Sequence, residues 1–163
     1  MSEKKSELAK AAPLTISSRP LILKHEISVA RVKRFWDGLE EGKVYATRCK
    51  KCGKLYYPPR NDCSQCLASD VEWVALSNEG IIETFTVSHL KPQGFEHYKE
   101  PYIIAIVRTL EGAKVMGWLE GVSPEKVSIG LVGQRVRITT TVKPDGYPAI
   151  VFKLAEEERK VER

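Results

Sequence analysis

Four cysteines, the only ones in this chain of 163 residues, form two pairs with the spacing C-x2-C. Cys49 and Cys52 make the first pair, and Cys63 and Cys66 follow ten residues later. Two residues between thiolates allow one tight turn to aim both sulfurs at a single point, and two facing knuckles make a tetrahedral four-thiolate site. We therefore predict a closed zinc site of the zinc-ribbon kind, whose metal holds the fold and has no open position for substrate.

Two alternatives share these cysteines. A pair of structural disulfides needs an oxidising compartment, and nothing in the sequence points to secretion, so the spacing favours a metal. Iron in a rubredoxin-like site has the same four ligands as zinc, so both metals remain open. Gly53 follows the second ligand and permits the positive φ with which such a knuckle closes. Three lysines beside the first knuckle would offset the negative charge of the thiolates: Lys50, Lys51 and Lys54.

The positive charge of the chain, +5 overall, is concentrated before residue 61. Residues 1–60 hold 14 Lys/Arg against 6 Asp/Glu, which gives +8, and the remainder holds 12 against 15, which gives −3. This distribution suits an anionic ligand such as a phosphate, or an acidic partner surface; a solvated basic tail is the plain alternative. No apolar run approaches the roughly 18 residues of a membrane helix. The N-terminus lacks the apolar segment of a secretory signal, so we expect a cytoplasmic protein without membrane contact.

A helical pattern begins after a polar arm. We interpret residues 1–27 as a flexible arm and predict a helix over residues 28–43. Apolar side chains recur at spacings of three, four and three: Val29, Val32, Trp36 and Leu39. Phe35 flanks this stripe, which must pack on the second domain or on another protein, because a small ribbon offers it little cover.

The rest of the chain is predicted to be mainly β. The zinc ribbon occupies residues 44–70, and a second domain follows over residues 71–156, with a charged tail at 157–163. Strands are expected at residues 71–76, 81–90, 102–110, 113–120, 134–142 and 149–155, with one short helical turn at 124–127. Strands of this number and length suit a five-stranded closed barrel of the OB type, and a small β-sandwich is the competing fold.

The sequence offers little with which to build an enzyme. All four cysteines are committed to the metal, and no Gly-rich phosphate loop, metalloprotease motif or nucleophile elbow occurs. The three histidines, His25, His89 and His97, are scattered. A long loop carrying Phe95 and Tyr98 could hold contacts or simply plug a barrel end. We predict no catalytic residue.

Two functions fit these features. Zinc ribbons and OB barrels both bind single-stranded nucleic acid, but the expected barrel is not basic and offers a poor groove for a strand. The other function is that of a non-catalytic accessory subunit, which docks through its aromatic helix and uses its basic residues for an anionic cofactor such as coenzyme A.

An ordered set of motifs resembles one known family. The motifs are Phe35-Trp36-x-x-Leu39-x-x-Gly42, Cys49-x-x-Cys52-Gly53, Tyr57-Pro58-Pro59-Arg60-x-x-Cys63-x-x-Cys66, then Gly80 and an OB-like strand set. The chain from about residue 28 to residue 155 is similar to the zinc-ribbon/OB-fold proteins of domain-of-unknown-function family thirty-five. The resemblance implies an N-terminal helix, a rubredoxin-like zinc ribbon and a C-terminal OB barrel.

The resemblance also implies a link to acyl-CoA chemistry. Archaeal members of this family bridge acetoacetyl-CoA thiolase and hydroxymethylglutaryl-CoA synthase of the mevalonate pathway, and other members partner thiolase-like or hydratase-like enzymes. It therefore implies a scaffold that binds such enzymes and helps retain or channel the CoA thioester; a nucleic-acid-binding protein is the alternative. Candidate residues for CoA or partner binding are Arg31, Arg34, Phe35, Trp36, Arg60 and Phe95.

Overall fold

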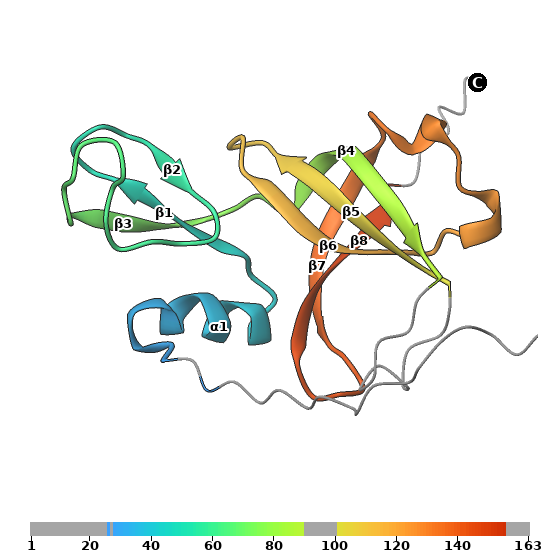
Figure 1. The fold of residues 1–163 in the computed structure, drawn as a ribbon, viewed down its shortest axis with the longest axis horizontal. Coiled ribbons are helices and arrows are strands. Elements are labelled where there is room, and N and C mark those ends of the chain that lie inside the picture. Colours follow the sequence, from blue (N-terminus) through green and yellow to red (C-terminus); the bar gives the residue numbers. More distant parts are fainter. Residues whose placement is uncertain (1–25, 27, 90–100, 156–163) are drawn as a thin grey trace, which may run out of the picture.

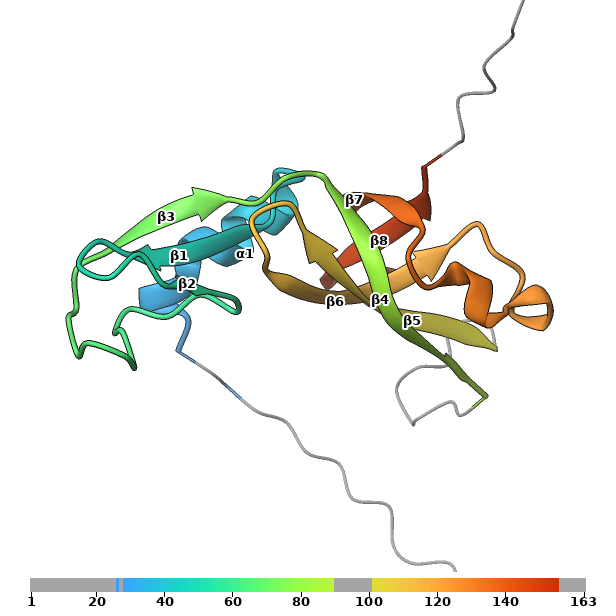
Figure 2. The ribbon, with the colours of Figure 1, turned by 90° about the horizontal axis from the view of Figure 1, so that it is seen from above.

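The chain forms a small ribbon sheet and a barrel that lie side by side, with one helix below the ribbon (Figures 1 and 2). The computed structural model describes residue 26, residues 28–89 and residues 101–155. Within these residues, no helix is long and apolar enough to span a membrane. Phe95 of the candidate set lies outside the described residues.

The ribbon is a three-stranded antiparallel sheet. Its strands are β1 (Tyr45–Cys49), β2 (Leu55–Tyr56) and β3 (Val71–Ala75), in the order β2-β1-β3. The central strand β1 ends at the first metal-ligand candidate, and the two-residue β2 follows the first knuckle directly. The sheet therefore holds the first knuckle at the end of its best-paired strand.

The strand β3 belongs to the ribbon. The sequence places the second domain from residue 71, whereas β3 pairs with the whole of β1, from Tyr45 opposite Ala75 to Cys49 opposite Val71. This pairing brings the Trp73 ring edge-on to Tyr45, with the ring centroids 6.3 Å apart. Such cross-strand aromatic pairs stabilise a small sheet, and the barrel strands begin only at Glu79.

The second unit is a closed five-stranded barrel with strand order β4-β5-β6-β8-β7. The strands are β4 (Glu79–Ser88), β5 (Tyr102–Thr109), β6 (Lys114–Glu120), β7 (Arg135–Val142) and β8 (Pro148–Leu154). Neighbours are antiparallel except β6 and β8, which are parallel. Closure and this strand order confirm the predicted OB barrel and exclude the sandwich. Two 3-10 turns, Pro124–Lys126 and Ile129–Leu131, connect β6 to β7.

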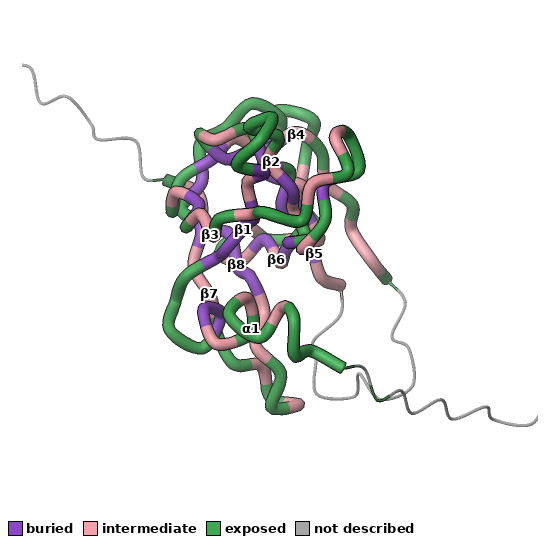
Figure 3. The backbone as a smooth tube through the Cα atoms, turned by 90° about the vertical axis from the view of Figure 1, so that its left-hand side faces the viewer, coloured by how far each residue is buried: buried purple, intermediate pink, exposed green. Residues whose placement is uncertain are grey.

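Alternation along the barrel strands builds one apolar core, seen as the purple segments in Figure 3. On β5, Ile103, Ala105 and Val107 are almost fully buried, while Ile104 and Ile106 on the other face are half-buried. This explains why the β5 sequence is apolar on both faces. The core also contains Leu39, Val44 and Leu76 from outside the barrel, so helix, ribbon and barrel share it.

The helix α1 (Lys33–Glu40) fastens the ribbon to the barrel. It is shorter than the sequence predicts, because residues Ala30–Val32 form a 3-10 turn before it. Leu39 is buried, and its carbonyl oxygen accepts a hydrogen bond of 2.6 Å from Thr140 Oγ1 on β7. Gly38 allows close packing on β1, since a Cβ at this position would lie 2.4 Å from the Tyr45 ring.

A carboxylate fixes the connection between β3 and β4. Glu111, in the turn between β5 and β6, accepts hydrogen bonds from the Ser77 backbone N–H at 2.9 Å and from the Ser77 hydroxyl at 3.2 Å. The neighbouring Leu76 N–H donates to the Val44 carbonyl at 2.8 Å. Both ends of this short connection are therefore tied, one to the barrel and the other to the ribbon.

Candidate metal centre and docking surfaces

The two cysteine knuckles have the same backbone design. In the first, Gly53 N–H donates to the Cys49 carbonyl at 2.8 Å, and Gly53 has φ +75°. In the second, Leu67 N–H donates to the Cys63 carbonyl at 2.9 Å, and Leu67 has φ +56°. Each knuckle thus closes through a left-handed residue placed directly after its second cysteine. The positive φ predicted at Gly53 is confirmed.

The four sulfurs converge on one point. Cys49 Sγ lies 3.5 Å from Cys66 Sγ, Cys52 Sγ lies 3.5 Å from Cys63 Sγ, and all four lie within 4.8 Å of one another. A tetrahedral zinc ion with Zn–S bonds of about 2.3 Å needs sulfurs about 3.8 Å apart, so this arrangement fits. A disulfide needs sulfurs about 2.05 Å apart, and all four cysteines are free thiols.

Hydrogen bonds make the four thiols unequal. The Tyr56 hydroxyl lies 3.1 Å from Cys63 Sγ, and this bond is the main reason why the pKa of Cys63 is lowered to about 5. At Cys66 the backbone N–H of Ala68 favours the thiolate, but burial and the thiols of Cys63 and Cys49 outweigh it and raise the pKa to about 12. Cysteine ligands bind zinc as thiolates, so metal binding is expected to release protons from the site.

The lysines beside the first knuckle have partners of their own. Lys50 Nζ forms an ion pair with Asp70 at 2.8 Å, and the hydrogen bond to this carboxylate raises the lysine pKa. Lys54 Nζ lies 5.4 Å from the centre of the Tyr56 ring. Lys50 is therefore neutralised within the ribbon, so the predicted offset of thiolate charge is only partly available from these lysines.

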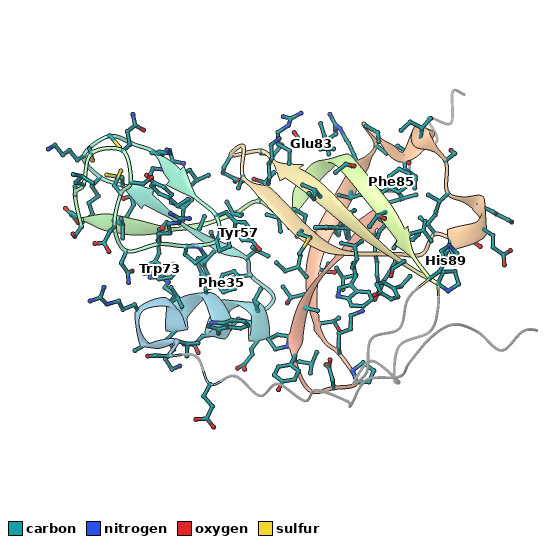
Figure 4. The ribbon with its side chains drawn as sticks, in the orientation of Figure 1. Phe35, Tyr57, Trp73, Glu83, Phe85 and His89 are labelled. Atoms are coloured by element: carbon teal, nitrogen blue, oxygen red, sulfur yellow. The ribbon has the colours of Figure 1, made fainter. Side chains whose placement is uncertain are left out.

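The two aromatic residues of α1 differ in burial: Phe35 packs toward the ribbon, whereas Trp36 is partly exposed to solvent. Phe35 is half-buried and lies edge-on to Trp36 at 5.5 Å and to Tyr57 at 6.1 Å between ring centroids. Figure 4 shows Phe35, Tyr57 and Trp73 in the region between α1 and the ribbon. Burial raises the pKa of Tyr57 to about 12. Two members of the stripe remain open to solvent, Trp36 at 41% exposed and Val29 at 37%.

The candidate arginines lie in different places. The Arg34 guanidinium lies 5.0 Å from the centre of the Tyr45 ring and 6.0 Å from that of Trp73, so it bridges α1 and the ribbon. Arg31 is exposed in the 3-10 turn that precedes α1. Arg60 lines a shallow hollow of about 400 Å³ beside the second knuckle, and neither helix arginine lines it. The predicted set is thus divided between the helix and the ribbon.

A second hollow, of about 350 Å³, lies between the ribbon and the turn that joins β5 to β6. It is lined by Leu55, Tyr57, Glu111, Gly112, Ala113 and Lys114. Neither hollow has a histidine or a pair of carboxylates in its wall. Sequence reasoning missed Tyr56 and Glu111, although an aromatic residue seven positions before a ligand cysteine is a signal that could be searched for.

Geometry and topology together define a protein with a four-cysteine zinc ribbon followed by an OB-fold barrel. Residues 36–72 match the ChsH2 rubredoxin-like zinc ribbon domain, and residues 73–141 match the ChsH2 C-terminal OB-fold domain. A DUF35 domain-containing scaffold protein of Methanocaldococcus jannaschii is 33% identical over 131 residues, covering 79% of this chain and 91% of that protein. The chain therefore belongs to the DUF35 family, as its motifs predicted.

Other relatives carry names from CoA thioester metabolism. The benzoylsuccinyl-CoA thiolase subunit BbsA of Thauera aromatica is 32% identical over 106 residues, covering 65% of this chain and 71% of that protein. A 3-oxo-4,17-pregnadiene-20-carboxyl-CoA hydratase alpha subunit of Mycobacterium tuberculosis is 32% identical over 112 residues, covering 68% of this chain but 34% of that longer protein.

A solved structure shares the fold. The structure named Ltp2-ChsH2(DUF35) aldolase superposes with a TM-score of 0.65 and 23% sequence identity, covering 83% of this chain and 98% of that one. At this identity the likeness supports the arrangement of ribbon and barrel and leaves function to other observations.

Proposed function

We propose that this protein is a non-catalytic accessory subunit that binds an acyl-CoA enzyme of the thiolase type and helps to retain its CoA thioester. The observation that carries the proposal is family membership: relatives matched over most of their length are named scaffold proteins or a thiolase subunit. The hydratase relatives extend far beyond the matched region, so their names do not require chemistry from this part of the chain.

The structure supports a role without catalysis. A zinc ion held by all four cysteines has no open coordination position, so it stabilises the ribbon and does not activate water or substrate. The two hollows lack the grouped titratable side chains that acid–base catalysis needs. Catalysis would then belong to the partner enzyme, and this subunit would contribute proximity between two active sites.

Proposed docking and ligand residues come from α1 and the ribbon. Trp36 is a large, partly exposed aromatic side chain on a helix that is anchored by Leu39, and such side chains dominate many protein interfaces. Arg31 and Arg60 are exposed, and the forked N–H donors of their guanidinium groups suit the phosphates of CoA. We extend the proposal to a hydroxymethylglutaryl-CoA synthase-like second partner, which would receive the thioester.

One observation favours a second candidate, single-stranded nucleic-acid binding. Tyr102 on β5 and Trp118 on β6 form an aromatic pair with ring centroids 4.9 Å apart, on the barrel face that OB folds use for oligonucleotides. The basic side chains on this side of the barrel, however, are paired with acidic side chains. Lys143 binds Glu120 at 2.6 Å, which leaves little charge for phosphates.

The test begins with the chain purified from its native cells and identification of the co-eluting enzymes. Each acyl-CoA enzyme is then produced separately, mixed with the zinc-loaded chain, and examined by analytical ultracentrifugation. We expect a complex of fixed stoichiometry, from which less labelled thioester escapes into solution than from the enzymes alone. Turnover of acyl-CoA by the isolated chain, or failure of every such enzyme to bind, would contradict the proposal.

A further inference from the structure

A tyrosine from the ribbon sheet reaches the metal centre. Tyr56 ends the short strand β2, where it lies opposite Thr47 of β1, and is only 8% exposed. Its hydroxyl lies 3.1 Å from Cys63 Sγ, 3.0 Å from Ser64 N and 3.2 Å from Ser64 Oγ. It packs in one buried cluster with Cys49 and Cys63. One side chain thus contacts a metal ligand and the residue that follows it.

The direction of these hydrogen bonds follows from their partners. A backbone N–H can only donate, so the Tyr56 hydroxyl oxygen accepts the bond from Ser64 N. A metal-bound cysteine is a thiolate and can only accept. The single phenolic proton is therefore directed to Cys63 Sγ, with Ser64 Oγ as the competing acceptor.

Tyr57 directly follows the strand β2, and its side chain lies on the opposite side from that of Tyr56. Successive side chains of a strand point to opposite sides, so Tyr56 turns toward the cysteines while Tyr57 turns toward the Phe35 ring of α1. Tyr57 is not in the cysteine cluster and instead packs against the main core. This pair gives a matched control, because both residues can lose the same hydroxyl group.

We propose that Tyr56 is a positioning residue of the metal centre: its hydroxyl, oriented by the Ser64 amide, donates a hydrogen bond to the metal-bound sulfur of Cys63. The bond fixes the direction of this sulfur and draws electron density from it. The ligand is thereby protected against protonation and against electrophiles. Partners of this kind around a metal commonly change its affinity by about 10–100-fold.

The experiment compares the full zinc-loaded chain with its Tyr56→Phe, Tyr57→Phe and Ser64→Ala variants. Zinc transfer to the chromogenic chelator 4-(2-pyridylazo)resorcinol gives the release rate, and competition with the same chelator gives the affinity. We expect Tyr56→Phe to release zinc roughly tenfold faster or more. Tyr57→Phe should stay within about twofold of the natural protein, and Ser64→Ala should be no faster, since it removes only the competing acceptor.

Cobalt substitution gives a readout that packing alone would not move. The sulfur-to-cobalt charge-transfer band should shift to longer wavelength in Tyr56→Phe, because an unbonded thiolate is easier to oxidise, and should be unchanged in Tyr57→Phe. Circular dichroism confirms that the barrel is folded in each variant. Tyr56→Phe with unaltered release and band, or Tyr57→Phe or Ser64→Ala with the same acceleration as Tyr56→Phe, would overturn the proposal.

Discussion

At the scale of single residues, the two knuckles differ at the position after the second cysteine. The first has Gly53 and the second has Leu67, and both adopt positive φ. Leu67 is 84% exposed, so burial of its side chain does not compensate the strained backbone. Left-handed backbone costs a residue with Cβ about 1–2 kcal/mol, whereas glycine adopts it freely.

Replacing Leu67 with glycine should therefore stabilise the zinc-loaded protein. The relief of about 1–2 kcal/mol exceeds the roughly 0.4–1 kcal/mol that glycine loses by making the unfolded chain more flexible, so we expect a net gain of about 0.5–1 kcal/mol. Urea unfolding at fixed zinc measures it. Gly53→Ala is the control. No atom lies near its Cβ position, so the substitution tests the positive φ alone, and it should destabilise the protein. A less stable Leu67→Gly variant would show that the leucine side chain makes compensating contacts.

At the scale of elements, helix α1 carries one apolar residue that anchors it in the core and another that is exposed. Leu39 is 4% exposed within the shared core, whereas Trp36 is 41% exposed. Leu39→Ala should cost about 2–5 kcal/mol of folding free energy, the range for deletion of a buried aliphatic side chain. Trp36→Ala should cost roughly 1 kcal/mol, the value of its ring contact, and should weaken the enzyme complex at least tenfold.

Thermal unfolding and titration against the purified enzyme partner separate these two effects. A Trp36→Ala variant as unstable as Leu39→Ala would place Trp36 in the core. If the Trp36→Ala variant bound the enzyme with unchanged affinity, Trp36 would not be part of the docking surface.

The Glu111 connection predicts a pH effect. Burial alone would raise the pKa of this carboxyl, but hydrogen bonds from its own backbone N–H and from Ser77 outweigh burial and lower the pKa below 4.5. A lowered folded-state pKa gives stability that is present above the unfolded value and is lost as pH falls through the folded value. Glu111→Gln should thus cost roughly 1 kcal/mol at pH 7, and the two proteins should converge in stability as the pH falls below the ordinary range of a glutamate carboxyl and the folded protein takes up the proton.

Chemical unfolding of both proteins between pH 7 and pH 3.5 measures this convergence. Glu125→Gln, on the exposed 3-10 turn Pro124–Lys126, serves as the matched control for the loss of one surface carboxylate. A constant difference between Glu111→Gln and the natural protein across the range would contradict the assignment.

The elements differ in how well the sequence predicts them, and the reason is the range of their contacts. Barrel strands such as β5 and β7 were predictable from local signals: β7 alternates in sequence, and β5 is a short apolar run that ends before the turn at Gly112. The cysteine site was predictable because its spacing encodes the geometry. The membership of β3 in the ribbon and the contact of Glu111 with Ser77 depend on partners distant in the chain, which local patterns do not specify. The contact of Tyr56 with Cys63 spans only seven residues, but a tyrosine so placed has no general meaning without the knuckle geometry.

At the scale of the whole molecule, the arrangement of charge separates the two candidate functions. On the barrel face that carries Tyr102 and Trp118, carboxylates compensate most of the positive charge: Glu83 pairs with both Arg108 at 2.8 Å and Lys114 at 2.6 Å. The Lys143 ammonium lies 4.8 Å from the Trp118 ring and is paired with Glu120. The cations on this face are already paired with Glu83 and Glu120, so they would neutralise few phosphates of a nucleic-acid strand. Exposed arginines lie elsewhere: Arg31 before α1, Arg60 in the ribbon, and Arg135 and Arg137 on β7.

We therefore expect acyl-CoA to bind, alone or with the partner enzyme, and oligonucleotides to bind weakly. Acetyl-CoA and a single-stranded oligonucleotide are titrated at 50 mM and 200 mM salt into the natural protein and into Arg31→Ala, Arg60→Ala and Trp118→Ala. Binding that uses 6–10 phosphates falls by about 10³–10⁵ over this salt range, whereas a ligand with apolar contacts loses less. The arginine variants should weaken acetyl-CoA binding several-fold, while Trp118→Ala should leave it unchanged. Oligonucleotide binding that persists at 200 mM salt and is lost in Trp118→Ala, without acetyl-CoA binding in any state, would establish the nucleic-acid function instead.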